Sequence, residues 1–304
     1  MSNPQLGQFL AILSTICFAG GGVFVSKAAR IRGDSGVLFS IFATMVFSCA
    51  LWLILEEDSR QLVHDHDWWQ GIAWFALAGL FAMVFGRSLL YTSIRYLGVT
   101  RSSALKRLNP FFSALLAWVF LAEPITLLDG AGMAAIACAF ILLIKANKNS
   151  GSLDPAASRL SSMSYMWGVG SALAYAFAYI SRKYGLENIN APVFGTMISA
   201  VSGFLFFVVA AGFVRTYRES LLNLFSNLNR WLVLAGVFVS AGQILSFSAL
   251  YYEKVSTVVM INSMEIFLSS FLSVVIFRTE KRPEMMTYIA AVIATVGVVV
   301  VAVG

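Results

Sequence analysis

Charged residues are scarce in this sequence of 304 residues: only 12% are Asp, Glu, Lys or Arg, whereas 59% are hydrophobic. A typical soluble domain carries about 25% charged residues, so the composition excludes a water-soluble protein. Outer-membrane barrels are excluded as well, because the apolar segments are continuous and lack the alternation of a barrel strand. We therefore expect an all-α integral membrane protein.

Cysteine and histidine are also rare. The three cysteines, Cys17, Cys49 and Cys138, lie in apolar segments without CxxC spacing, which supports neither a disulfide framework nor a metal site. The only two histidines, His64 and His66, share a short polar loop with aspartates, where a solvated pair is far more common than a metal site. We expect no metal and no cofactor.

Long apolar runs recur along the whole chain. About 20 helical residues cross the hydrocarbon layer of a membrane, and ten segments of that kind fit the sequence. Their predicted limits are 6–26, 36–55, 69–94, 98–121, 126–145, 163–183, 192–214, 231–252, 255–277 and 284–303. The connections are short, so no soluble domain of useful size remains. The first segment lacks a basic leader and a cleavage site, and we expect it to be retained.

The net charge of +6 indicates topology rather than binding of nucleic acid, because the basic residues gather in short loops. The even-numbered loops hold four of them, Arg60, Arg182, Lys183 and Lys254. The odd-numbered loops hold fourteen: Lys27, Arg30, Arg32, Arg95, Arg101, Lys145, Lys148, Arg159, Arg215, Arg218, Arg230, Arg278, Lys281 and Arg282. By the positive-inside rule the odd loops are cytoplasmic, which places both termini outside.

The chain also repeats itself. At an offset of 156 or 157 positions, CFAGGGVFVSK falls on AYAFAYISRK, and VFLAEP falls on VIFRTEK. This predicts two units, residues 1–148 and 163–304, with a linker over 149–162. Each unit has five spans, and because five is odd, the second enters the membrane inverted. In such folds the substrate site lies near the midplane between the halves.

Polar residues inside the spans mark the candidate site. At the same offset Lys106 and Asn109, beside Pro110, fall on Asn262 and Glu265. Each pair has i, i+3 spacing, which places both side chains on one helix face. Arg87 falls on Gln243, and Tyr91 lies one turn beyond Arg87. Charges at this depth are costly against lipid, so they are expected to face a cavity or a partner.

These features resemble the EamA-type members of the drug/metabolite transporter superfamily. The resemblance rests on a polar and aromatic first helix in each half, a third helix with G-[RQ]-x-x-x-[YF], and a fourth helix that runs into an acidic turn, LAEP or FRTEK. It implies a secondary carrier, often an exporter of amino acids or related metabolites. It also implies peripheral fifth and tenth helices and cytoplasmic termini, against the charge count, so the orientation stays open.

The functional hypothesis is a secondary transporter of a small polar metabolite, an amino acid or a related carboxylate or amine, working by alternating access in export or exchange. Tyr175 and Tyr179, one turn apart, are cavity-lining or packing aromatics. Gly20 to Gly22 permit close helix packing or unwinding near the site. The predicted substrate-binding residues are Arg87, Tyr91, Lys106, Asn109, Tyr175, Tyr179, Gln243, Asn262 and Glu265.

Several alternatives stand beside this hypothesis. Lys106 and Glu265 form either a substrate site or an internal ion pair, and Glu265 is a candidate proton carrier. Arg107 lies about 100° round the helix from Lys106 and faces either the cavity or a loop. A flippase for an anionic lipid or lipid-linked sugar would use a similar basic cavity. An enzyme is poorly supported, because the spans hold no catalytic motif. We expect a monomer in a bacterial inner membrane, with a small molecule and the lipid bilayer as its partners.

Overall fold

The computed structural model describes residues 3–32, 37–56, 66–149, 162–226, 228–272 and 285–303. Every regular element within these ranges is a helix. In chain order they are α1 (Pro4–Arg32), α2 (Val37–Leu55), α3 (His66–Gly79), the π-helical η2 (Leu80–Gly86), α4 (Arg87–Lys106), α5 (Asn109–Leu121), α6 (Leu127–Asn149), α7 (Ser162–Asn188), α8 (Pro192–Phe213), α9 (Arg215–Leu222), α10 (Arg230–Tyr252), α11 (Val255–Asn262), α12 (Glu265–Phe271) and α13 (Met285–Val303).

The prediction of ten spans is not confirmed. Among the described residues, six stretches are long and apolar enough to cross a membrane: Pro4–Ala28, Val37–Leu55, Trp68–Ile94, Pro192–Phe213, Arg230–Tyr252 and Met285–Val303. Three shorter apolar stretches accompany them: Asn109–Leu121, Leu127–Leu142 and Val255–Phe271. Two of the four missing spans have a physical reason, since polar breaks divide the predicted spans 98–121 and 255–277. The coarser result is an all-helical membrane protein that crosses the bilayer several times.

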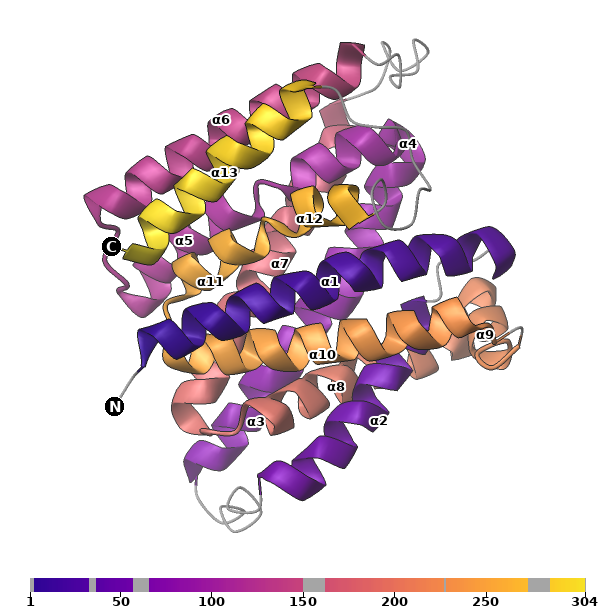
Figure 1. The fold of residues 1–304 in the computed structure, drawn as a ribbon. Helices are drawn as coiled ribbons and strands as arrows, with labels where there is room; N and C mark the ends of the chain where they lie inside the picture. The colour runs from indigo at the N-terminus through magenta and orange to yellow at the C-terminus, as the bar shows by residue number, and fades with distance from the viewer. Residues whose placement is uncertain are drawn as a thin grey trace.

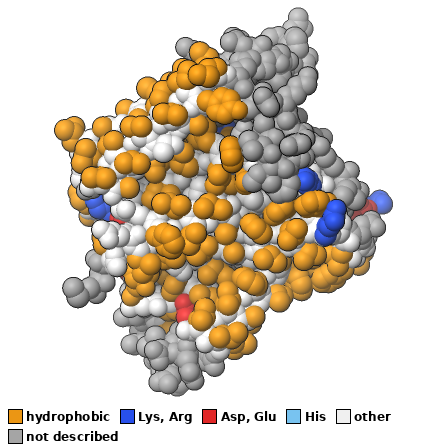
Figure 2. Space-filling model, in the orientation of Figure 1, with side chains coloured by type: hydrophobic (Ala, Val, Ile, Leu, Met, Phe, Trp, Pro, Cys, Tyr) orange, Lys and Arg blue, Asp and Glu red, His pale blue; other side chains and the backbone are white. Residues whose placement is uncertain are grey.

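The outer surface suits lipid rather than water. Large apolar side chains lie exposed along it, among them Leu127 at 90%, Phe213 at 86% and Val303 at 80% exposure. Figure 2 shows one face covered mostly by hydrophobic side chains, with few charged groups between them. Such a surface would promote aggregation in water, whereas hydrocarbon imposes no penalty on it.

Two long helix pairs frame the bundle. Helix α1 lies along α10, and α6 lies along α13 at one edge of the molecule (Figure 1). A Cβ added to Gly297 would stand 2.9 Å from the carbonyl oxygen of Gly132, so α6 and α13 meet backbone to backbone. A Cβ added to Gly20 or Gly21 would come within 2.9 Å of α10 side chains, as expected for packing through small residues.

Candidate functional site

Two helices in the centre of the bundle are broken at positions related by the sequence repeat. Helix α4 ends at Lys106, and α5 restarts at Asn109 with Pro110 in its first turn, because proline cannot continue a helical hydrogen-bond ladder. Helix α11 ends at Asn262, and α12 restarts at Glu265. The continuous helix predicted over 255–277 is therefore interrupted. Irregular backbone at this depth is tolerated where it lines a cavity, and both breaks carry polar side chains there.

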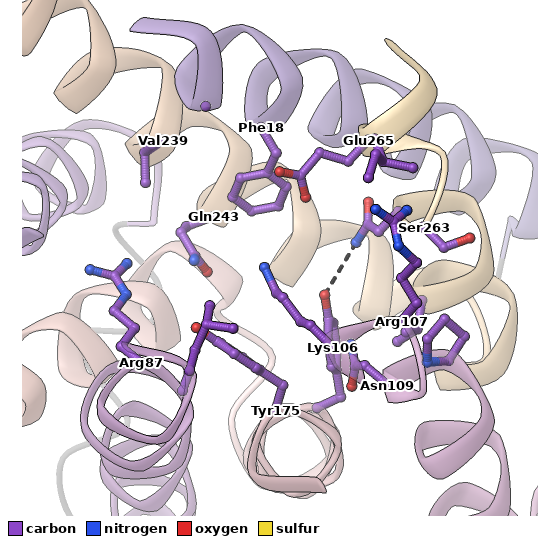
Figure 3. Close-up of a pocket in the computed structure, with 18 of the residues that line it drawn as sticks. Phe18, Arg87, Lys106, Arg107, Asn109, Tyr175, Val239, Gln243, Ser263 and Glu265 are labelled. Carbon is purple, nitrogen blue, oxygen red and sulfur yellow. Dashed lines mark hydrogen bonds between the residues drawn. The ribbon is translucent and has the colours of Figure 1, made fainter. Parts of the chain in front are cut away.

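A cavity of about 450 Å³ lies between these breaks. Its wall is built from both halves of the chain, with side chains from α1, α4, α7, α10 and α12 (Figure 3). All nine residues predicted from the sequence line it: Arg87, Tyr91, Lys106, Asn109, Tyr175, Tyr179, Gln243, Asn262 and Glu265. The structure thus brings together the whole predicted set around one cavity.

Asn262 is held by three neighbouring helices. Its Nδ2 donates to the hydroxyl of Tyr179 at 3.4 Å, the dashed line in Figure 3, and to Ser246 Oγ at 3.3 Å. Its Oδ1 accepts a hydrogen bond from Thr15 Oγ1 at 3.1 Å. Asn262 therefore fixes the break after α11 as well as lining the cavity. Gln243 differs, because its buried Oε1 has no hydrogen-bond partner among the described residues.

Two cations of the cavity contact an aromatic ring or a hydroxyl rather than a carboxylate. Lys106 Nζ lies 5.2 Å from the ring centroid of Tyr175, and Arg87 Nη1 donates a long hydrogen bond of 3.4 Å to Ser40 Oγ. Within the described ranges no ion pair of 4.0 Å or less joins Lys106 to Glu265, although both line the same cavity (Figure 3). In this conformation the internal ion pair considered from the sequence is not formed.

The sequence did not lead us to predict Arg182 as a site residue, and it left two positions open for Arg107, the cavity or a loop. Arg182 was assigned to an even-numbered loop, but it lies in α7, is 4% exposed and lines the cavity. A signal was available, since Tyr175, Tyr179 and Arg182 follow i, i+4, i+7 spacing and so share one helix face. Arg107 also lines the cavity, with its Cζ 5.2 Å from the ring centroid of Phe140 and its Nη1 unpaired.

The cavity is closed at the end where α7 and α10 finish. One hydrophobic cluster fills this end with side chains that are each at most 1% exposed. They include Phe75, Phe247, Leu250, Val255 and Val258. Such a packed layer leaves no water path through it. The molecule therefore presents a site that is sealed on one side.

Two carboxylates cap helix N-termini at this sealed end. Glu123, just after α5, accepts the backbone N–H of Val255 at 3.0 Å, and Glu56, just after α2, accepts those of Val193 and Phe194 at 2.9 Å each. Both carboxylates occupy helix N-termini, where the helix dipole favours negative charge. Burial raises the pKa of Glu56 and of Glu123, while the backbone hydrogen bonds oppose that rise.

No group of three or more His, Cys, Asp or Glu residues among the described positions is arranged to hold a metal ion. The sequence motif considered for metal, His64 with His66, falls outside the residues whose side chains the structure describes.

Comparison with known proteins gave a family and a fold. The model of the EamA-like transporter family matches the chain twice, at residues 5–145 and 162–303. A search of curated proteins found no match. A solved structure described only as "Crystal structure of protein" matches with a TM-score of 0.67 at 12% sequence identity, over 97% of this chain and 96% of that chain. At this identity the match shows a shared fold alone.

Proposed function

The chain belongs to the EamA-like transporter family, and on that premise we propose that it is a secondary active transporter of a small polar metabolite. The substrate is an amino acid or a related compound with a carboxylate or an amine, moved by export or exchange. The protein works as a monomer in a bacterial inner membrane by alternating access, in which the two halves rock about a central site.

One observation carries this proposal: polar residues from both family-matched segments line a single cavity that is sealed at one end. A carrier needs a site that is reached from one side at a time, and a sealed central cavity meets that requirement. Since both segments contribute side chains to the wall, movement of one against the other would change the side on which the site opens.

The chemistry of the wall indicates how a substrate would be held. Arg87 and Lys106 suit a carboxylate, because cationic donors form strong hydrogen bonds to anionic oxygens. Glu265 suits an amine, and it is the group we propose to carry a proton if transport is coupled to protons. The rings of Tyr91 and Tyr175 offer faces for apolar or cationic parts of the substrate.

Binding to the purified protein tests this proposal. A panel of amino acids and organic acids would be screened by thermal unfolding in detergent, since a ligand at a hundred times its Kd adds about 2.7 kcal/mol of stability. Lys106→Ala and Glu265→Gln should each reduce the affinity of the stabilising compound by about tenfold or more, because each removes a charge-assisted hydrogen bond.

The matched control is Arg215→Ala. Arg215 lies in α9 with an 89% exposed side chain that pairs with Glu219, so the variant should bind as the wild type does. Expression and unliganded melting temperature should stay close to wild type in all three variants. Full affinity in both Lys106→Ala and Glu265→Gln would move the substrate site away from this cavity.

A further inference from the structure

Arg182 is a buried cation without a counter-charge within 4.0 Å among the residues that the structure describes. It lies at the sealed end of the cavity, and its guanidinium Cζ stands 5.0 Å from the ring centroid of Tyr179 and 4.7 Å from that of Phe247. Its Nε has no hydrogen-bond partner, and no carboxylate among the described residues lies within 4.0 Å of it. Ring faces attract a guanidinium but leave its charge uncompensated.

The excess of positive over negative charge extends to the whole cavity. Four cations line it, Arg87, Lys106, Arg107 and Arg182, against Glu265 as the one carboxylate among the described lining residues. The wall therefore carries an excess of three positive charges. A buried charge without a partner is unfavourable, and a protein that keeps several together has another source of negative charge.

Buried N–H donors without an acceptor also indicate an anionic ligand. Besides Arg182 Nε, the buried Nη1 of Arg107 lacks an acceptor in the part of the chain that the structure describes. Arginine presents its N–H groups as a planar fork that matches the oxygens of a carboxylate or a phosphate. Arg182 lies in α7 and Arg107 lies in the turn between α4 and α5, so the two unpaired positions belong to different parts of the cavity wall and can each meet a separate anionic group.

We propose that Arg182 is a substrate-binding residue, and that the substrate carries two anionic groups, one of which docks against Arg182 at the sealed end of the cavity. The second group is held by the remaining cations, and an amine, where present, faces Glu265. The class comprises dicarboxylates, acidic amino acids and small phosphate monoesters that also carry a carboxylate. This inference rests on the proposed transport function and narrows its substrate.

The test uses pairs of probes in which one member has two anionic groups and the other has one: succinate with butyrate, glutamate with glutamine, and 3-phosphoglycerate with glycerate. Their stabilisation of the purified full-length protein is measured by thermal unfolding over a concentration series. In at least one pair the more highly charged member should bind about tenfold more tightly or better. The pair in which this happens separates carboxylate from phosphate recognition.

Two substitutions assign the effect to Arg182. Arg182→Met removes the charge and keeps an unbranched side chain between the two rings, so it should abolish the preference while the unliganded melting temperature stays equal or rises. Arg182→Lys keeps a cation and should restore the preference in part. Arg215→Gln, the same loss of charge at an exposed position, should behave as the wild type does.

Two outcomes would overturn the inference. The first is wild-type protein that shows no preference for the more highly charged member of any pair. The second is an Arg182→Met variant that keeps the wild-type preference, because Arg182 would then be a structural cation. In each case, transport of a neutral or singly charged solute would leave the proposed function intact.

Discussion

Lys106 and Glu265 face one cavity from the two halves of the chain without forming an ion pair within 4.0 Å in the described structure. Each charge is therefore free to meet a ligand in this conformation. The geometry favours a binding role over a fixed structural bridge.

Arg87 should distinguish anionic from neutral ligands. Within the described part of the chain its guanidinium makes one long hydrogen bond, to Ser40, so its other donors are available to a carboxylate. Arg87→Ala should weaken carboxylate ligands by about tenfold or more, because a charge-assisted hydrogen bond contributes about 1.5–3 kcal/mol. Neutral analogues should lose much less affinity. Isothermal titration of a carboxylate and its amide against both proteins measures this, and equal losses would make Arg87 a structural residue.

Individual polar residues were the most predictable part of the site. A charge in an apolar span has few acceptable positions, so Arg87, Lys106 and Glu265 could be placed in an interior cavity from the sequence alone. Arg182 could not be placed in this way, because it stands close to a predicted span end, where a basic residue is usual. Its burial depends on the length of α7 and on Phe247 of a neighbouring helix, which only the fold reveals.

Helix breaks were only partly predictable. Pro110 is a local signal for the first break, since its ring disfavours a regular helix through this point, although residues 98–121 were predicted as one span. The break between Asn262 and Glu265 contains no proline, and the sequence predicted a continuous helix there. Asn262 is instead bonded to Thr15, Tyr179 and Ser246, so contacts with other helices define that position. Long-range side-chain bonds of this kind leave no local signal.

The carboxylate caps on α8 and α11 should make stability depend on pH. Burial raises the pKa of Glu56 and Glu123 above the ordinary value of 4.5, so the folded protein binds these protons more tightly than the unfolded chain does. Their contribution to the free energy of unfolding is fully present below about pH 4.5 and is lost as pH rises through the raised pKa values.

Thermal unfolding in detergent between about pH 4.5 and 8 checks the sign. Relative to a Glu56→Gln, Glu123→Gln double variant, the wild type should lose melting temperature as the pH rises. Glu219→Gln is the matched control, because Glu219 is an exposed carboxylate on α9, and its profile should follow the wild type. Parallel profiles for wild type and double variant would show that neither cap is buried enough to matter.

The two family matches, at residues 5–145 and 162–303, agree with the internal repeat at an offset of 156 or 157 positions. The repeat was predictable because its motifs recur at one offset. The exact division at residues 148 and 163 and the inverted relation of the halves stay predictions. The substrate was not predictable, since it depends on how side chains from distant parts of the chain combine in one cavity.

Transport by reconstituted protein tests the central claim most directly. Proteoliposomes preloaded with the compound that most stabilises the purified protein would be given a trace of the same compound with a radioactive label. A carrier should accumulate the label by counterflow, and Lys106→Ala should remove most of this uptake while Arg215→Ala keeps it. Tight binding without counterflow in the wild type, or wild-type counterflow in Lys106→Ala, would contradict a carrier that works through this cavity.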